Sequence, residues 1–302
     1  MRNLVSLLFL VLFFTGCDKI PPRVPPVKPE CTLDSAAIIV RTNALVSNTR
    51  KVLLEDYTGH TCGNCPPAAK KAEELLGKYN RLIVIANHVS ETFAKPKVLD
   101  YFEDFRDPSS TDWDVFFNMS GAGLPKGSVN RMLILDKYPQ NYSTWEGNVV
   151  SELAKPQSVK LDLTTTYDPG QKILNVKVLT TFKAVIAEDV YLNMVLTMDS
   201  VVGDQKDYLP PSGAVVVNGD RRPDYRFDHI MVKSLNGTWG QLLKSGGTAV
   251  NDTVSVRKDC NVVSKCFYKD QVCTDDRHMY LVVFAYNNKT KEILQVEKVK
   301  IR

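Results

Sequence analysis

The chain has 302 residues, of which 44% are apolar and 24% are charged, and its formal net charge is +4. This length and composition are those of a globular protein that buries a full hydrophobic core and divides into two domains. A weak net charge without a basic cluster excludes nucleic acid as an expected partner.

The chain begins with a stretch that is typical of an export signal. Arg2 precedes an apolar run over residues 4–14, which is too short to span a bilayer. The run ends in Thr15-Gly16-Cys17. A small residue before a cysteine at this point is typical of a lipoprotein signal, so we predict a signal peptide over residues 1–16 and a lipid on Cys17. A buried N-terminal helix with a chance cysteine is the alternative.

Residues 17–35 connect the predicted lipid to the folded part of the chain. Residues 21–29 read Pro-Pro-Arg-Val-Pro-Pro-Val-Lys-Pro, a composition that favours an extended polyproline conformation. We therefore expect a semi-rigid stalk that holds the folded part above the lipid headgroups. Asp18, which follows the lipidated residue, leaves the choice between inner and outer membrane open.

Two predicted strands lead to a pair of cysteines. Residues 37–46 are apolar and partly β-branched, which predicts a strand that joins the same sheet as the next one. That next strand covers residues 52–57 and leads to Cys62-Gly63-Asn64-Cys65. A helix follows, because Pro66 and Pro67 suit a first turn and the sequence up to residue 76 propagates it.

The Cys-x-x-Cys spacing at the start of a helix indicates a redox pair. The leading sulfur would lie among unpaired backbone N–H groups at the positive end of the helix dipole, which favours the thiolate. Cys62 is therefore the predicted nucleophile and Cys65 the predicted resolving thiol. Asp56 lies inside the apolar strand, where a carboxylate is unfavourable without a partner or a role. We predict that Asp56 relays a proton beneath the dithiol.

The segment after the dithiol helix continues the sheet and then inserts helices. Residues 82–88 form a continuous apolar run, which is typical of a strand buried on both faces. Helices are predicted over residues 97–105 and 111–118, within an insertion at about 90–122. Their aromatic side chains are expected to pack inward, and a wall beside the dithiol that receives an unfolded or peptide partner is the other interpretation. The capping box Ser143-Thr144-Trp145-Glu146 predicts a further helix.

These features resemble the thioredoxin-like proteins, in which a strand with a buried acid leads to Cys-x-x-Cys and a cis-proline later faces the sulfurs. The later match is Gly123-Leu124-Pro125. The resemblance implies that Pro125, with Leu124 beside it, holds the backbone of a partner next to the sulfurs. Thr61 replaces the tryptophan that usually precedes the first cysteine, and Gly63-Asn64 replaces Gly-Pro, so no particular redox potential is implied.

A narrower resemblance rests on three motifs. The chain is similar to the outer membrane protein 28-related lipoproteins of Bacteroidetes in the segment from Tyr57 to Pro66, in Pro125 with Val129-Asn130-Arg131, and in Asp228-His229-Ile230 with Asn236-Gly237-Thr238-Trp239-Gly240. The resemblance implies location and architecture: an outer membrane lipoprotein that faces the periplasm or the cell surface.

The period of the apolar residues changes from helical to two near residue 156. Residues 159–163 and 174–178 alternate on either side of the turn Asp168-Pro169-Gly170, which predicts a hairpin. Further strands are predicted over residues 191–197, 228–232, 279–286 and 293–301. Many short antiparallel strands indicate a β-sandwich. The predicted fold is a thioredoxin-like α/β domain at residues 36–155, followed by an immunoglobulin-like antiparallel β-sandwich at residues 156–302.

The remaining cysteines are assigned to structure. An exported protein meets an oxidising compartment, so Cys31, Cys260, Cys266 and Cys273 are expected to form two disulfides in one of three connectivities. Zinc bound by the last three with His278 is the alternative, although the spacing lacks a Cys-x2-Cys pair. We expect no metal and no cofactor.

Two histidines lie near the predicted dithiol site. His60 is two residues before Cys62, and His88 ends a strand whose carboxyl edge should face the same crevice. Each is expected either to stabilise a thiolate or only to form local hydrogen bonds.

Two functions are consistent with these residues. The first is a membrane-anchored exported lipoprotein that carries out thiol–disulfide exchange through Cys62 and Cys65. Its partners would be exported proteins or peptides with cysteines, and its membrane contact the lipid on Cys17. The second is an outer-membrane surface binding or adhesion lipoprotein with a structural Cys62–Cys65 disulfide. Asp56 favours the first, because a structural bridge requires no acid beneath it.

Overall fold

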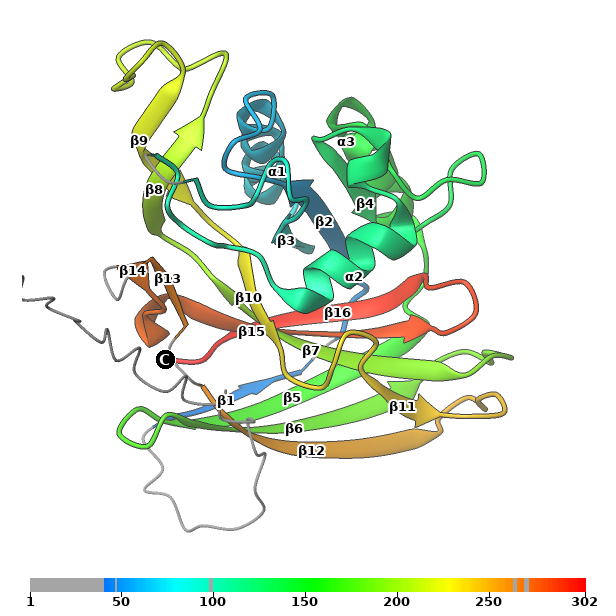
Figure 1. Cartoon of the computed structure of the whole chain (residues 1–302). Helices are drawn as coiled ribbons and strands as arrows, with labels where there is room; N and C mark the ends of the chain where they lie inside the picture. Colours follow the sequence, from blue (N-terminus) through cyan, green and yellow to red (C-terminus); the bar gives the residue numbers. More distant parts are fainter. Residues whose placement is uncertain (1–40, 47, 98–99, 263–264, 269–271) are drawn as a thin grey trace, which may run out of the picture.

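The computed structural model describes residues 41–302, apart from residues 47, 98–99, 263–264 and 269–271. The predicted signal peptide, Cys17, the stalk and Cys31 therefore lie outside the described residues. Within them the protein is mixed α/β and consists mostly of strands, with three α-helices (Figure 1).

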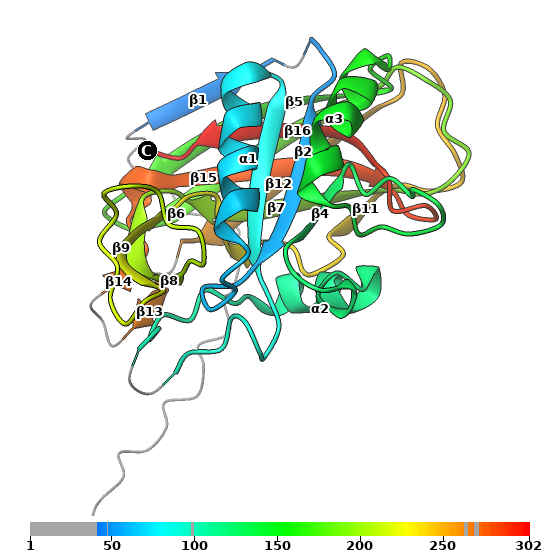
Figure 2. The same ribbon diagram turned by 90° about the horizontal axis from the view of Figure 1, so that it is seen from above.

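The strand before the dithiol, β2 (Val52–Thr58), has both of its edges occupied. It pairs in parallel with β3 (Leu82–His88) and antiparallel with β4 (Lys126–Val129). All seven residues of β2 are buried, as expected for an apolar run covered on both faces. The helices α1 (Pro66–Lys78) and α3 (Trp145–Ala154) lie over this part of the sheet (Figure 2).

One sheet contains strands from both halves of the chain. Its order is β16-β15-β7-β10-β3-β2-β4, and β11 pairs with β7. The second half supplies β7 (Val190–Met198), β10 (Ile230–Ser234), β11 (Gln241–Lys244), β15 (Met279–Asn287) and β16 (Ile293–Lys300). β10 joins β3 through the parallel pair Ile230 and Ala86, so the hydrogen bonding runs from one half into the other.

A second sheet has the order β1-β5-β6-β12 and faces the first across a large apolar core. It contains β1 (Arg41–Leu45), β5 (Val159–Asp168), β6 (Ile173–Phe182) and β12 (Thr253–Asn261). β1 pairs antiparallel with β5, so the prediction that this strand joins the sheet of the dithiol strand was wrong. The reason is that β3 and β4 already take the two edges of β2.

The predicted insertion contains one of its two helices. α2 (Pro108–Phe117) is confirmed: Asp107 caps it by accepting from the Ser109 N–H at 2.9 Å. The described residues of 97–105 are not helical, so that prediction was wrong. Tyr101 adopts a positive φ of 59°, which a helix does not tolerate, and Phe105 packs into the core between the two sheets.

The residues after β4 tie three elements together. Asn130 and Arg131 have φ values of 49° and 53°, which end the strand at Val129. The Asn130 side chain accepts from the Leu53 N–H at 2.9 Å, and its amide donates to Glu152 of α3 at 2.8 Å. Its carbonyl accepts from the Ile293 N–H at 2.9 Å. The Val129-Asn130-Arg131 motif is therefore a junction between β2, α3 and β16.

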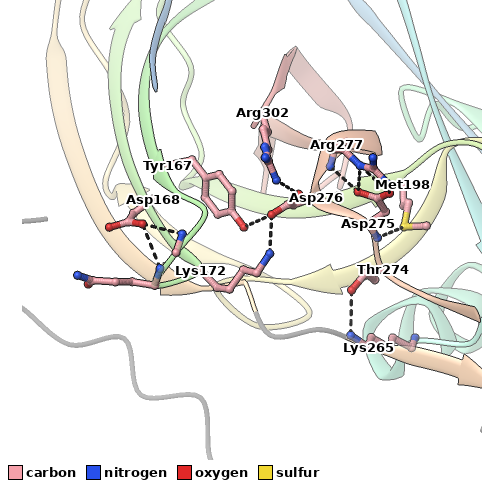
Figure 3. Close-up of polar contacts among 12 residues, drawn as sticks. Tyr167, Asp168, Lys172, Met198, Lys265, Thr274, Asp275, Asp276, Arg277 and Arg302 are labelled. Carbon is pink, nitrogen blue, oxygen red and sulfur yellow. Dashed lines mark hydrogen bonds and ion pairs between the residues drawn. The ribbon is translucent and has the colours of Figure 1, made fainter. Parts of the chain in front are cut away.

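A buried carboxylate fixes the end of the chain. Asp276 accepts hydrogen bonds from Tyr167 at 2.9 Å, Lys172 at 2.7 Å and Arg302 at 2.9 Å (Figure 3). These partners come from the end of β5, the turn after it and the last residue of the chain, so this one side chain holds the two sheets together at this end.

Candidate functional site

Cys62 and Cys65 form a disulfide at the carboxyl end of β2. The helix α1 starts at Pro66, with Cys65 as its N-cap, so Cys62 lies in the turn before the helix and not in its first turn as predicted. Pro66 and Pro67 explain the difference, because residues without an N–H are tolerated only at the first helical positions. The two sulfurs are bonded to each other, so both lie near the positive end of the helix dipole.

Asp56 lies a few residues before this disulfide and is almost completely buried, with 2% of its surface exposed. Its Oδ1 atom has no hydrogen-bond partner among the described residues. Burial raises the pKa of the carboxyl group from 3.8 to about 7. At neutral pH the carboxyl group of Asp56 is therefore partly protonated.

A cavity of about 580 Å³ lies between α1, the ends of β2 and β3, and the hairpin of β8 (Val201–Lys206) and β9 (Arg221–Phe227). Asp56 and Cys65 both line it, whereas Cys62 does not. Thr58 and His88, which are opposite each other on β2 and β3, complete its polar end. In Figure 1 the β8–β9 hairpin rises beside α1. Of the two cysteines of the disulfide, Cys65 is therefore the one that borders the cavity.

Residues 205–208, which we call the strap, run across the loop that carries Cys62. The Lys206 N–H donates to the His60 carbonyl at 2.7 Å, and the Tyr208 N–H donates to the Gly63 carbonyl at 3.0 Å. The Gln205 side chain donates to the Cys62 carbonyl at 3.1 Å. Under the strap each cysteine is only 2% exposed. No pattern in the sequence indicated this contact, which joins segments more than 140 residues apart.

The strap explains the glycine between the two cysteines. A Cβ atom on Gly63 would lie 2.7 Å from the ring of Tyr208, closer than real side chains approach. Gly63 therefore allows the tyrosine ring to pack directly on the dithiol loop.

His60 and His88 do not supply a positive charge to the site. Both are buried, and neither imidazole has a hydrogen-bond partner among the described residues. Burial lowers the pKa of His60 to about 4 and that of His88 to about 3, so both are neutral at pH 7. They pack on Phe105, with ring centroids 6.1 and 4.9 Å away. Local hydrogen bonding of the two rings is therefore not found among the described residues, and stabilisation of a thiolate stays a prediction.

The segment expected to face the sulfurs lies beside the dithiol strand. The Leu124–Pro125 peptide bond is cis, and β4 begins directly after it, with Lys126 opposite Tyr57 of β2. Both Leu124 and Pro125 are half-buried, and Leu124 packs against an aromatic core cluster.

His229, which belongs to the motif Asp228-His229-Ile230, forms part of the cavity wall. Its Nε2 lies 3.0 Å from Glu73 of α1, and its Nδ1 lies 3.0 Å from Asp199. Burial opposes protonation, but the hydrogen bonds to Asp199 and Glu73 raise the pKa of His229. This residue was missed as a site residue because its neighbours come from distant parts of the chain. It links α1 to the second half of the chain at the cavity.

The cysteines assigned to structural disulfides are partly described. Cys260 is buried in β12, and Cys273 is disulfide-bonded. Cys266 of β13 (Cys266–Tyr268) lies opposite Cys273 of β14 (Val272–Cys273). Cys31 lies outside the described residues, so the predicted pairing of all four stays a prediction.

The described residues contain no group of three or more His, Cys, Asp or Glu side chains placed to hold a metal ion. None of the helices in this part of the chain combines the length and apolar character needed to cross a membrane.

Comparison with known proteins identifies a family. The family model described as outer membrane protein Omp28 matches residues 114–302. The matched region begins after Cys62 and Cys65, so it contains the β8–β9 hairpin and the motif residues near Asn130 and His229 but not the dithiol. A search of the curated proteins finds no match.

Three solved structures are similar to this chain to different degrees. HBP35 of Porphyromonas gingivalis is 15% identical with a TM-score of 0.57, over 84% of this chain and 76% of that one. A protein of Agrobacterium tumefaciens is 11% identical with a TM-score of 0.47, over 84% and 96%. A domain of the outer membrane lipoprotein Omp28 from P. gingivalis is 12% identical with a TM-score of 0.30, over 48% and 88%. At these identities the likeness to HBP35 concerns the fold alone.

Proposed function

The chain belongs to the Omp28 family of outer membrane proteins, and on that premise we propose that it is a thiol–disulfide oxidoreductase held at the outer membrane. Its partners are exported proteins or peptides with cysteines, and its membrane contact is a lipid on Cys17. No cofactor is needed, because the electrons pass between sulfur atoms.

The proposed reaction uses the two cysteines in turn. The Cys62 thiolate attacks a partner disulfide and forms a mixed disulfide, and one partner sulfur leaves as a thiolate. Cys65 then attacks Cys62, which re-forms the internal disulfide and releases the reduced partner. Asp56 accepts the proton of the Cys65 thiol, and Pro125 holds the partner backbone beside the sulfurs. Because Cys62 is 2% exposed, the strap must move aside for the first step.

The observation that carries this proposal is the position of Asp56. An acid with no partner for Oδ1 among the described residues lies in the wall of the same cavity as Cys65, and its pKa of about 7 suits proton transfer at neutral pH. A disulfide that only stabilises a fold has no use for such an acid, which destabilises the folded state whenever it ionises.

The finer architecture is part of the proposal. The order β3-β2-β4, with α1 directly after the dithiol and a proline before β4, supports a thioredoxin-like unit in the first half. The strands of the second half lie in two facing sheets, which supports an immunoglobulin-like sandwich. The shared sheet means that the two units are built against each other and not linked by a free hinge.

One observation favours the alternative, a binding or adhesion protein in which the Cys62–Cys65 disulfide is structural. Both cysteines are 2% exposed, and the strap makes three hydrogen bonds over them. In this interpretation the strap is a permanent cover and the disulfide fixes the loop on which it rests.

A trapping experiment separates the two functions. Cys65→Ser leaves Cys62 without its resolving thiol, so mixed disulfides with exported proteins should accumulate in cells after acid quenching. Cys62→Ser is the matched control, because it also replaces one cysteine of the pair by serine but removes the nucleophile. Bands that appear on non-reducing gels for Cys65→Ser alone support the exchange reaction. An empty lane beside a normally expressed Cys65→Ser protein would support the structural disulfide.

A further inference from the structure

We propose that the cavity beside α1 binds a low-molecular-mass thiol, which exchanges with the Cys62–Cys65 disulfide at the sulfur of Cys65. The proposal rests on the proposed function of the dithiol and adds a second route to it. Protein partners react at Cys62, whereas a small thiol reacts from the cavity.

The two sulfurs differ in what surrounds them. Cys65 lines the cavity, and Cys62 does not. The loop of Cys62 is instead held by the strap, through the bond from Gln205 to the Cys62 carbonyl and the bond from Tyr208 to the Gly63 carbonyl. Both cysteines are 2% exposed, so each route requires local movement, and Cys65 is the cysteine that a thiol in the cavity meets first. Attack on Cys65 expels Cys62 as the leaving group, which suits a displacement that enters on the side away from Cys62.

The size of the cavity favours a small molecule. Its volume of about 580 Å³ falls within the range of roughly 300–1,000 Å³ that is typical of small-molecule sites. The wall opposite α1 consists of Tyr225 and Phe227 of β9, and Arg222 on the same strand is held by Asp207 at 3.1 Å. A space of this volume between a helix and a hairpin is too small for a folded protein, whereas a molecule of a few residues fits into it.

The polar end of the cavity supplies what a thiol needs for reaction. The attacking species is the thiolate, so a proton acceptor must lie near the entering sulfur. Asp56 lines the same cavity as Cys65, is buried, and has an Oδ1 without a hydrogen-bond partner among the described residues. His88, whose ring nitrogens also have no such partner, lines the same end and can accept a hydrogen bond from the bound molecule.

The exchange balances as two successive displacements. Asp56 takes the proton of the first thiol, whose sulfur forms a bond to Cys65 while the Cys62–Cys65 bond breaks and Cys62 leaves as a thiolate. A second thiolate, which has lost its proton to water, attacks the sulfur of the bound molecule and releases it as a small disulfide. Cys65 leaves with the electron pair and takes the proton from Asp56. Two small thiols are oxidised to one small disulfide. The Cys62–Cys65 disulfide accepts the two electrons and becomes a dithiol.

The first test locates the mixed disulfide in the wild-type protein. The oxidised protein is mixed with reduced glutathione, quenched with acid at short times, alkylated and digested, and the glutathione-bearing peptide is identified by mass spectrometry. Cys62 and Cys65 are told apart by fragmentation. Glutathione on Cys65, with alkylated Cys62, is the expected result. Glutathione on Cys62, or no reduction by glutathione, would overturn the proposal.

The second test narrows the cavity without changing a sulfur or an acid. Ala69 of α1 lines the cavity, so Ala69→Leu should slow reduction by glutathione by about an order of magnitude. Gly77→Leu is the matched control, because it adds a leucine to the same helix where a new Cβ has no atom within 4 Å. Equal rates for Ala69→Leu and Gly77→Leu would overturn the proposal, and circular dichroism checks that both variants fold.

These outcomes are separate from those of the trapping experiment. If glutathione attaches to Cys65 while the Cys65→Ser trap stays empty, the cavity reaction stands and the exchange with exported proteins fails. If the trap captures partners while glutathione attaches to Cys62, the protein function stands and the cavity route is wrong.

Discussion

Arg131 donates two hydrogen bonds to Glu55 at a point where neither side chain has any exposed surface. Its Nε lies 2.8 Å from Oε2 and its Nη2 lies 2.7 Å from Oε1. The guanidinium also lies over aromatic rings of both halves of the chain, 4.8 Å from the centroid of Trp113 and 5.1 Å from that of Phe284. Glu55 directly precedes Asp56 in β2, so this pair fixes the dithiol strand against β15.

We predict that Glu55→Gln lowers the free energy of unfolding by about 3–5 kcal/mol, because it leaves the Arg131 cation buried without a carboxylate. Arg131→Lys should also lower it, since lysine cannot form the two parallel hydrogen bonds or the flat contact with the rings. Urea unfolding with the disulfide intact measures both changes.

The matched control for this prediction is Glu91→Gln, which removes an exposed carboxylate that pairs with Lys95 and Arg106. Exposed pairs contribute little, so the urea midpoint should stay at the wild-type value. A loss for Glu55→Gln no larger than that for Glu91→Gln would show that the buried pair does not hold the dithiol strand.

The features that sequence alone predicted have local causes. The hairpin of β5 and β6 follows from strict alternation around Asp168-Pro169-Gly170, and it forms as predicted. The strand, dithiol and helix sequence around Cys62 is equally local. The predicted helix after the capping box also forms, as α3, but Ser143 does not cap it: the helix begins at Trp145 without a side-chain cap.

The features that the sequence did not predict depend on distant partners. The aromatic spacing of residues 97–105 suggested a helix, but Phe105 packs on Phe227 and Phe267, at 4.9 and 5.1 Å, and the chain extends to reach them. For the site, Cys62, Cys65 and Asp56 were found because strand burial and cysteine spacing are visible locally. The sequence did not show which of the two cysteines borders a cavity, because the strap at residues 205–208 comes from the other half of the chain.

A second prediction concerns the membrane anchor. Family membership places the chain at the outer membrane, and Thr15-Gly16-Cys17 indicates how it is held there. The wild-type protein should partition into the detergent phase and carry a lipid mass on Cys17, and Cys17→Ser should lose both. A Cys17→Ser protein that stays with the membrane, beside a wild-type protein without lipid, would refute the anchor.

A third prediction tests the strap as a movable cover. Tyr208→Ala removes the ring that packs on Gly63, so the loop of Cys62 becomes more accessible. Reduction of the disulfide by a protein dithiol such as thioredoxin should become severalfold faster. Reduction by glutathione should change little, because the small thiol reaches Cys65 through the cavity, which Tyr208 does not line.

Tyr208→Phe is the control for this change, because it keeps the ring and removes only the hydroxyl group. It should behave as the wild type with both reductants. If Tyr208→Ala accelerates the two reductants equally, the strap does not separate two routes to the disulfide.

The last prediction concerns the effect of Asp56 on stability and its dependence on pH. The folded-state pKa of Asp56 is about 7 against 3.8 for the ordinary group. Between these pH values the folded protein binds a proton that the unfolded chain has released, so this residue makes stability fall as pH rises from about 4 to about 7. The loss stays in full above pH 7 and amounts to about 4 kcal/mol at most.

The amide introduced by Asp56→Asn has no proton to lose, so this variant should be more stable than the wild type at pH 8 and nearly equal to it at pH 4. Urea unfolding at the two pH values, with the disulfide intact, measures the difference. The same variant should turn over its dithiol more slowly, since the proton acceptor beside Cys65 is gone. A variant that is no more stable at pH 8 would show that Asp56 is not held as a buried, unpaired acid. Greater stability together with slower exchange is the result expected of a residue that serves the reaction at the expense of the fold.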